Sequence, residues 1–293
     1  MDGLLVINKP SGKSSHDLVY AVRRITGENR VGHAGTLDPM ATGVLVLCLG
    51  QAVRVSEYLI DHDKTYRARV RLGVETDTFD AAGRVVATRG VDVTADDIGV
   101  ALNSFLGKIS QRPPAHSAVQ RGGVRAYKLA RQGIVLELAP REVEIYSIRL
   151  REVSGDEVEF DVHCSKGTFI RSLAHDLGQK LGTGAHLARL TRLASGPFTI
   201  ESSMTLDELE AAVARSELAR YLLPIERALL GFDAVHLDNA SVRGVRQGRF
   251  VPMPAHVNTL LVRAYDEQGG LIALLEKVGV DMLKPKKVFS AND

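Results

Sequence analysis

One carboxylate in this chain stands in a setting that suits chemistry. Asp38 precedes Pro39 in the segment GHAGTLDPMATGVL (residues 32–45), which carries three glycines and no other acidic residue. The residue before a proline is biased toward extended or turn backbone, and glycine lets the main chain approach a ligand closely. A carboxylate presented on such a loop can serve as a nucleophile or as a proton acceptor. Asp-Pro pairs also occur in ordinary turns, where the Asp side chain binds its own backbone.

Other sequence patterns with chemical potential are incomplete. The segment SGKSS (residues 11–15) resembles a phosphate-binding loop, but that motif needs a glycine five residues before Gly12, and Ile7 stands there. The histidines and the two cysteines, Cys48 and Cys164, show no metal-ligand spacing, and no G-x-S-x-G elbow occurs. The sequence therefore predicts neither an NTPase nor a metal site, and it weakens a hydrolase interpretation.

The elements that must position Asp38 are short strands and amphipathic helices. We expect strands at residues 3–8, 43–49, 64–72, 142–150 and 158–164, and helices at 14–25, 94–105 and 169–181. Ser14 with Asp17, and Thr94 with Asp97, have the spacing of helix N-terminal capping pairs, and Gly27 should end the first helix. This irregular interleaving predicts an α+β fold with a mixed, largely antiparallel sheet flanked by helices.

Length and composition are those of a soluble globular protein. The chain has 293 residues, of which 45% are hydrophobic and 25% charged, so we expect one large domain, residues 1–232, and a small β domain, residues 233–293. The longest apolar run, residues 44–49, is too short to span a membrane. No signal peptide is visible and cysteines are few, which predicts a cytoplasmic protein.

Basic residues are segregated along the chain, although the net charge is only +2. Residues 98–136 contain six basic residues and no acidic one, and residues 239–265 contain four arginines and no acidic one. A surface that gathered these tracts would attract a polyanion such as nucleic acid. Solvated basic faces without a partner would give the same pattern.

Six segments follow one another over about the first 200 residues: NKPSGKSSHD (8–17), GHAGTLDPMATGVL (32–45), KTYRA (64–68), ETDTFDAAG (75–83), QRPPAHSAV (111–119) and CSKGTFIRSLAHDLG (164–178). This ordered set resembles the bacterial tRNA pseudouridine-55 synthases, the TruB family. The last sixty residues match less clearly, and only their position and basic strands resemble the family's small PUA-type RNA-binding domain. The resemblance implies that a uridine in the T arm of tRNA is isomerised to pseudouridine. The N1 glycosidic bond breaks, the base turns, and C5 joins the sugar, which needs no metal or organic cofactor.

The resemblance also implies roles for single residues. Asp38 matches the catalytic Asp, which attacks the base or the sugar or takes a sugar proton, and Arg171 matches the Arg that keeps this carboxylate ionised and oriented. Tyr66 matches the aromatic residue that packs on the flipped base and takes the C5 proton. His33 matches the residue that fills the space left by that base. Apart from the resemblance, Arg171 could be a phosphate contact, His33 a structural histidine and Tyr66 a core residue.

The remaining matched positions are expected to bind the substrate, and three segments depart from the family pattern. The substrate-binding set is Lys9, Lys64, Asp80, Lys166, Phe169 and Leu190. Phe169 and His116 stand where many members have Tyr, and LTRL (190–193) stands where many have LRRT. The missing hydroxyl at position 169 leaves stacking possible there and removes proton transfer.

We therefore expect a monomeric, cytoplasmic tRNA pseudouridine synthase that needs no cofactor, no membrane and no protein partner. Two alternatives remain open from the residues: an RNA-binding or RNA-folding protein without catalysis, and a synthase acting on another RNA. The combination of Asp38, Tyr66 and Arg171 argues against the first alternative, whereas the second is left open by these three residues.

Overall fold

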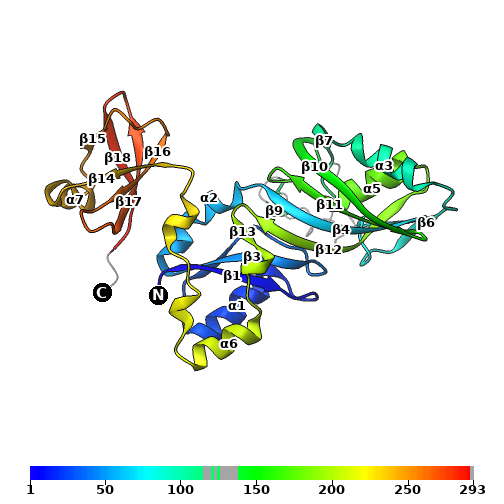
Figure 1. Ribbon diagram of the computed structural model, residues 1–293, viewed down its shortest axis with the longest axis horizontal. Coiled ribbons are helices and arrows are strands. Elements are labelled where there is room, and N and C mark those ends of the chain that lie inside the picture. Colours follow the sequence, from blue (N-terminus) through cyan, green and yellow to red (C-terminus); the bar gives the residue numbers. More distant parts are fainter. Residues whose placement is uncertain (115–119, 122–123, 126–137, 291–293) are drawn as a thin grey trace.

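The chain folds around two β-sheets that lie at opposite ends of an elongated molecule (Figure 1). This computed structural model describes residues 1–114, 120, 121, 124, 125 and 138–290. The larger sheet contains strands from the first 200 residues, and the smaller one begins at Asp233.

The larger sheet has nine strands in the described part of the chain. Its order is β1-β3-β12-β4-β11-β10-β7, with β2 added beside β3 and β13 beside β12. Every pair is antiparallel except β12 with β3. The strands are β1 Gly3–Lys9, β2 Val31–Ala34, β3 Thr42–Leu49, β4 Lys64–Leu72, β7 Gly107–Gln111, β10 Arg141–Ser154, β11 Glu157–Cys164, β12 Ala185–Ser195 and β13 Phe198–Thr199.

Two helices cover one face of β1 and β3, namely α1 (Ser15–Thr26) and α6 (Leu206–Ala214). Helix α1 forms where the sequence predicts it, because Ser14 and Asp17 make a reciprocal capping box and Gly27 ends the helix in the left-handed conformation. The apolar side chains of both helices pack against alternate residues of the two strands, which anchors the start of the loop that carries Asp38.

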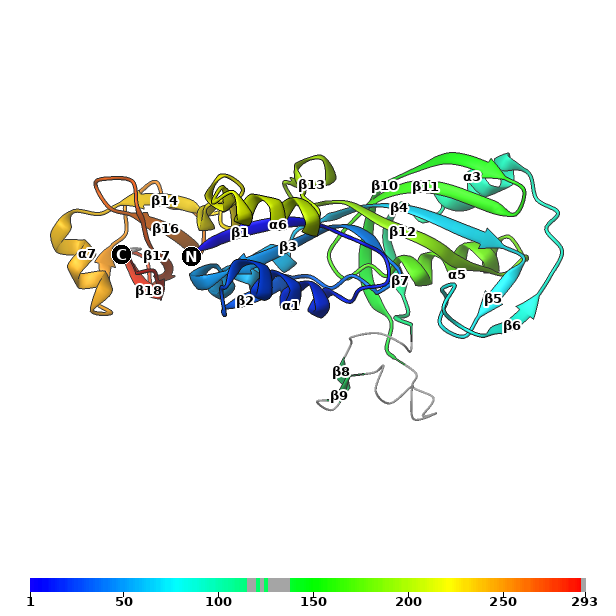
Figure 2. The ribbon, with the colours of Figure 1, turned by 90° about the horizontal axis from the view of Figure 1, so that it is seen from below.

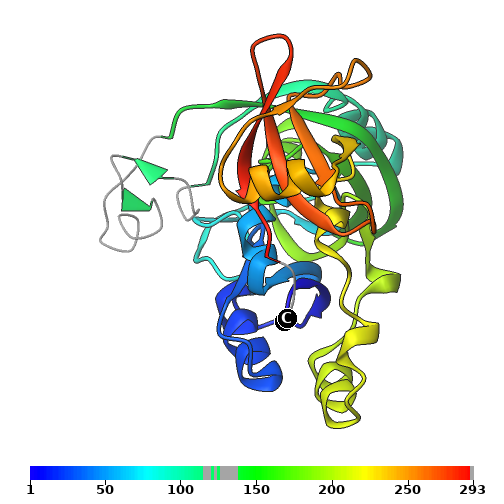
Figure 3. The same ribbon diagram turned by 90° about the vertical axis from the view of Figure 1, so that its left-hand side faces the viewer.

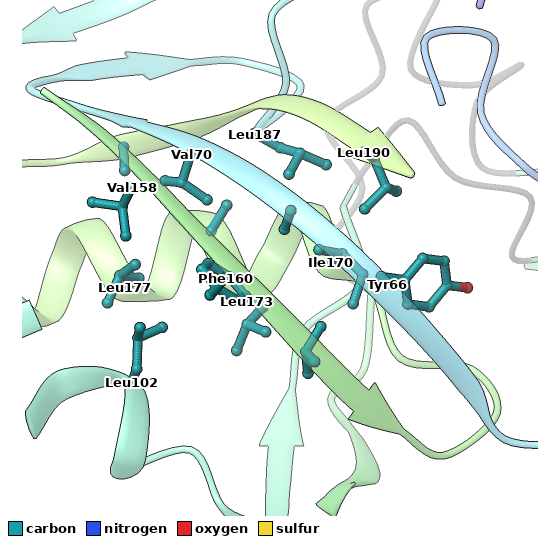
Figure 4. Packing of buried hydrophobic residues seen from close by; sticks show 14 of the residues in the cluster. Tyr66, Val70, Leu102, Val158, Phe160, Ile170, Leu173, Leu177, Leu187 and Leu190 are labelled. Carbon is teal, nitrogen blue, oxygen red and sulfur yellow. The ribbon is translucent and has the colours of Figure 1, made fainter. Parts of the chain in front are cut away.

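A second helical layer packs on β4, β11 and β12 at the other end of the sheet. It consists of α5 (Ile170–Lys180) and α3 (Ala95–Asn103). Alternate residues of β4, beginning with Tyr66, point into this core, which confirms the period-two pattern of the sequence. Figure 4 shows Tyr66 at one end of the cluster, with its hydroxyl directed away from the other labelled side chains. The Tyr66 hydroxyl therefore lies at the edge of this apolar cluster.

The smaller sheet has the order β14-β16-β17-β18-β15 and carries one helix. Figure 3 shows it from the end of the molecule at which it lies. Its elements are β14 Asp233–His236, α7 Asn239–Arg246, β15 Val251–Pro252, β16 Leu261–Tyr265, β17 Leu271–Val278 and β18 Met282–Val288. A separate apolar cluster, which includes Val245, Val262 and Leu275, fills its interior.

The two ends of the chain meet where the two sheets join. Leu4 on β1 belongs to the same apolar cluster as Leu274 and Phe289. Gln51 links the termini directly, since its amide nitrogen donates to Asp2 Oδ2 (2.8 Å) and to the Ser290 carbonyl (3.1 Å). Figure 2 shows the start of β1 beside the strands β17 and β18.

Short elements complete the described chain. They are η1 Gly50–Val55, α2 Ser56–Ile60, the hairpin β5 Val74–Thr76 with β6 Val85–Thr88, the hairpin β8 Gln120–Arg121 with β9 Val124–Arg125, η2 Ile200–Ser202, η3 Leu218–Arg220 and η4 Ile225–Ala228.

The expected fold class is confirmed: an α+β architecture with a largely antiparallel sheet, flanking helices and a small C-terminal β domain. The expectation that residues 32–45 begin as a loop is wrong. His33 lies on strand β2, paired with Leu47, and only the residues after Ala34 form the loop. None of the helices in the described part of the chain has the length and apolar character needed to cross a membrane.

Candidate active site

A cavity of about 590 Å³ opens where β4, β12, the Asp38 loop and the start of α5 converge. Seven of the ten residues expected at the site line it, from four separate segments of the chain. They are Asp38, Lys64, Tyr66, Lys166, Phe169, Arg171 and Leu190. The structure therefore brings together residues that are up to 152 positions apart, from Asp38 to Leu190 (190 minus 38).

The loop that carries Asp38 is fixed from behind. The Ser15 hydroxyl accepts from Leu37 N (2.9 Å) and donates to the Leu37 carbonyl (3.1 Å). Gly12 N and Lys9 Nζ both donate to the Pro39 carbonyl, at 2.8 and 3.1 Å. These contacts hold the backbone on both sides of Asp38, so the carboxylate is presented on a rigid support.

Arg171 joins Asp38 to a second carboxylate. Its Nε lies 3.0 Å from Asp38 Oδ2, and its Nη1 lies 3.2 Å from Asp80 Oδ2. The Arg171 and Asp80 side chains are 6% and 8% exposed, whereas that of Asp38 is 38% exposed. The planar guanidinium thus holds the more accessible carboxylate at one edge and is itself held by a buried one at the other.

Asp80 is in turn fixed by its own loop. Its Oδ1 accepts from the Thr78 hydroxyl (2.7 Å) and from Ala82 N (3.0 Å). Phe79, between Thr78 and Asp80, has a φ of 63°, a conformation that is strained for a bulky residue. Its ring stacks on His175 of helix α5 at 4.0 Å between centroids, a contact that compensates for this strain.

Burial and charge act in opposite directions on Asp38. Desolvation raises the pKa of its carboxyl above the ordinary value, the Arg171 guanidinium opposes this, and Asp80 adds to it. The ionised form of Asp38 therefore depends chiefly on the Arg171 guanidinium, with a smaller contribution from Lys9. The position of Arg171 and the protonation state of Asp38 are coupled.

Two of the expected substrate-binding lysines point their ammonium groups at main-chain carbonyls. Lys9 is fully buried and donates to the carbonyls of Pro10 and Pro39, so it lies behind the Asp38 loop and not on its surface. Lys64 donates to the carbonyls of Ile60 and His62 at the cavity wall. Burial lowers the pKa of each lysine to about 8.

Tyr66, Phe169 and Leu190 supply the apolar part of the cavity. Tyr66 and Leu190 are 9% and 8% exposed. Phe169 is the residue before helix α5, and the Arg141 guanidinium lies 5.4 Å from its ring centroid. Flat and aliphatic surfaces of this kind suit an unstacked planar base.

The remaining expected residues lie at the rim or outside the cavity. Lys166 is on the rim, where its ammonium contacts Asp61 at 2.8 Å. His33 is half-buried on β2 and is not part of the cavity lining. His116 and much of the basic tract at 98–136 lie outside the described residues.

Two residues of the site were missed by the sequence reasoning. Arg192, 1% exposed, lines the cavity beside Tyr66. The signal for it is a charged residue in the inward phase of β12, two positions after buried Leu190. Gln111 is fully buried and brackets Phe169, accepting from its N (2.7 Å) and donating to its carbonyl (3.0 Å). Its position in the segment QRPP was the available signal.

Within the part of the chain that the structure describes, no group of three or more His, Cys, Asp or Glu side chains could hold a metal ion. Independence of metals and cofactors stays a prediction.

Comparisons with known proteins identify the family of this chain. Residues 23–170 match the TruB family pseudouridylate synthase N-terminal domain, and residues 171–230 match the tRNA pseudouridylate synthase B C-terminal domain. The chain is 43% identical to tRNA pseudouridine synthase B of Aromatoleum aromaticum over 99% of this chain and 93% of that one. It is 40% identical to the protein of the same name from Solibacter usitatus over 99% of this chain and 100% of that one.

Solved structures give the same result. A Cbf5-Nop10-Gar1 complex contains a chain that is 29% identical, with a TM-score of 0.78 over 98% of this chain and 85% of that one. An H/ACA RNP bound to a substrate RNA containing 2′-deoxyuridine contains one that is 27% identical, with a TM-score of 0.76 over 99% and 86%. Because the family models match residues 23–170 and 171–230 and these relatives align over nearly the whole of this chain, it belongs to the TruB family of pseudouridylate synthases.

Proposed function

We propose that this protein converts the uridine at position 55, in the T arm of tRNA, to pseudouridine, with Asp38 as the carboxylate that reacts. Its family membership and its full-length relatives named tRNA pseudouridine synthase B support the reaction and the kind of RNA. The observation that carries the assignment of Asp38 is its place at the mouth of the cavity, joined to Arg171 at 3.0 Å.

Arg171 has two tasks in this proposal. It keeps Asp38 ionised when a nucleotide displaces water, since a carboxylate that loses its hydration gains a proton unless a cation lies close. It also holds the carboxylate in one orientation through its planar fork. Asp80 orients Arg171 from the buried side and does not touch the substrate.

The target uridine leaves its stack and enters the cavity. Unstacking costs a few kcal/mol, which contacts with the flipped base must compensate. Tyr66, Phe169 and Leu190 contact the base, and Tyr66 takes the C5 proton. His33, outside the cavity lining, occupies the space that the base leaves in the RNA, while Lys64 and Lys166 favour the nearby phosphates. Lys9 supports the Asp38 loop from behind.

The chain divides by task at about residue 232. Residues 1–232 carry the reaction, and residues 233–293 form a PUA-like domain that adds affinity for RNA. Exposed Arg243, Arg246 and Arg249 on and after helix α7 support this division, because cations that meet phosphates make binding depend on salt.

The protein works as a monomer in the cytoplasm, without a membrane, a cofactor or a protein partner. Light scattering of the free protein and of its complex with tRNA measures this, and a dimer in the active complex would contradict it.

Incubation with an unmodified tRNA transcript, followed by chemical mapping of pseudouridine, tests the function. We expect one modified position in the T arm with the wild-type protein and none with Asp38→Asn. Modification at another site, or only in a different RNA, would assign the protein to another substrate. Tight tRNA binding with no pseudouridine formed by the wild-type protein would favour an RNA-binding or RNA-folding role.

A further inference from the structure

Arg192 is a buried cation beside the phenol of the site. Strand β12 pairs with β4 so that Arg192 lies directly opposite Tyr66, and opposed residues of an antiparallel pair share one face. On its other side, Arg192 pairs with Gly43 of β3. Gly43 has a φ of +97°, and a Cβ atom there would lie 2.2 Å from the Arg192 carbonyl oxygen. Strand β3 can therefore approach Arg192 this closely only with glycine at position 43.

The guanidinium of Arg192 is not fully satisfied. Its Nε donates to the Val44 carbonyl at 2.6 Å, but its buried Nη2 has no hydrogen-bond partner. No ion pair joins Arg192 to a carboxylate among the residues that the structure describes, in contrast to Arg171. A buried, uncompensated charge is costly, so a negative group is expected beside it at some stage of the protein's work.

The Tyr66 hydroxyl could carry this negative charge, because Tyr66 lies directly opposite Arg192 in the β12–β4 pair. Burial raises the pKa of Tyr66, and the Arg192 guanidinium is the first influence that opposes it. Burial lowers the pKa of Lys64 and of Lys9, and the Arg192 guanidinium adds to this effect at both lysines.

We propose that Arg192 is a positioning residue for the reaction, whose guanidinium stabilises negative charge on Tyr66 Oη while the phenol has given its proton to the substrate. This inference rests on the proposed function. It adds a residue that was not predicted from the sequence, and it explains why Nη2 lacks a hydrogen-bond partner.

Proton balance explains why the phenol would be ionised for part of the reaction. The product has C5–C1′ in place of N1–C1′, and one hydrogen has moved from C5 to N1. Tyr66 gives its proton to N1 when N1–C1′ breaks, which leaves a phenolate. When C5 has joined C1′, the C5 proton passes to the phenolate, and the electron pair of that C–H bond restores the C5=C6 double bond.

One phenol can serve both atoms because of the geometry of the turn. A half-turn of uracil about the axis through N3 and C6 exchanges N1 with C5. A group beside the sugar-facing atom of the base therefore meets N1 first and C5 afterwards. Between the two transfers the negative charge stays beside Arg192.

The experiment compares Arg192→Gln, Arg192→Lys and the exposed control Arg189→Gln, which removes a cation from the same strand. Single-turnover rates and KM are measured on prefolded tRNA, in the wild-type and Tyr66→Phe backgrounds. We expect Arg192→Gln to lower the rate by about 10²-fold with KM changed by less than about threefold, as for loss of one oxyanion donor. In the Tyr66→Phe background the same change should cost less than threefold. Arg192→Lys should retain part of the rate, and Arg189→Gln all of it.

A direct measurement separates this inference from the proposed function. With 3-fluorotyrosine at position 66, ¹⁹F NMR follows the phenol titration, which should move up by about 1 to 3 pH units in Arg192→Gln. An unmoved titration, an equal rate loss in the Tyr66→Phe background, or an effect on KM alone would overturn the role of Arg192. Failure of Arg192→Lys to fold would assign Arg192 to the fold and overturn it too. Absence of pseudouridine with the wild-type protein would refute the proposed function, while the NMR titration would still report on Arg192 and Tyr66.

Discussion

Replacing Asp80 by Asn tests whether the buried carboxylate orients Arg171. The amide has the same shape, but it offers one acceptor and one donor where the carboxylate offers two acceptors. If the amide oxygen faces Thr78 and Ala82, its NH₂ faces the Arg171 Nη1 donor that lay 3.2 Å from Oδ2. If the amide flips, its NH₂ faces Ala82 N instead. In either orientation the amide NH₂ therefore faces another hydrogen-bond donor.

The structure sets the size of the effect. Asp80 and Arg171 are both buried, so their charge-assisted hydrogen bond is worth about 1.5–3 kcal/mol. If this free energy is lost only where Arg171 must hold Asp38 in the transition state, the rate falls about 10- to 150-fold. The affinity for tRNA should change by less than about threefold, because Asp80 makes no exposed surface for RNA.

Single-turnover conversion of an unmodified tRNA transcript gives the rate, and filter binding gives the affinity. Asp77→Asn is the matched control, since the Asp77 side chain pairs with Arg84, which is 92% exposed, on the same loop, and exposed pairs contribute about 0–1 kcal/mol. A folded Asp80→Asn protein with a rate within threefold of wild type would refute the reasoning. It would mean that Arg171 is oriented without Asp80, by Asp38 and by the Thr78 carbonyl, which accepts from Arg171 Nη1 at 3.4 Å.

Four further outcomes are expected. Asp38→Asn should bind tRNA normally and lose at least about 10³-fold in rate, as expected for an essential nucleophile, and turnover within tenfold of wild type would exclude that role. Phe169→Tyr should change the rate by less than about threefold while Tyr66→Phe slows it by 10²-fold or more, and the reverse order in the same assay would mean that the two aromatic roles are exchanged. Because burial lowers the pKa of Lys9 from 10.5 to about 8, the folded protein releases this proton first as pH rises. The free energy of unfolding of wild type relative to Lys9→Met should therefore increase by roughly 3 kcal/mol between pH 8 and 10.5, and urea titrations that stay parallel would contradict this. Substituting three exposed arginines of the C-terminal domain by Gln should weaken tRNA binding and flatten its salt dependence, with the rate at saturating tRNA retained; an unchanged salt slope would argue against the proposed task of Arg243, Arg246 and Arg249.

Sequence reasoning succeeded where local rules decide the structure. The capping pairs Ser14–Asp17 and Thr94–Asp97 form as expected, and β4 has the predicted bounds and inward face. These features depend on neighbours within a few residues, so a short window of sequence contains the whole cause.

It failed where distant partners decide the structure. Strand β12 lies between β3 and β4 in the sheet, yet Leu187, Leu190 and Leu193 recur with the spacing of a helix, and no strand was predicted there. Strand β2 exists because it pairs with β3, although VGHA alone carries no strand signal. The burial of Lys9 and the pairing of Arg192 with Tyr66 follow from the same long-range pairings, so the composition of the site was more predictable than the direction of each side chain.

The meeting of the two chain ends has a consequence for synthesis. Leu4 and Phe289 belong to one apolar cluster, so that cluster cannot close on a ribosome until Phe289 has emerged. Chains grow at about 5–20 residues per second, which leaves the first strand waiting roughly 15 to 60 seconds for its last partner. During that interval the half of β1 that faces this cluster, Leu4 and Val6, is exposed to other unfinished chains, whereas the half that faces α1 can already be covered. Slower translation should therefore increase aggregation of this protein more than that of one whose termini lie apart.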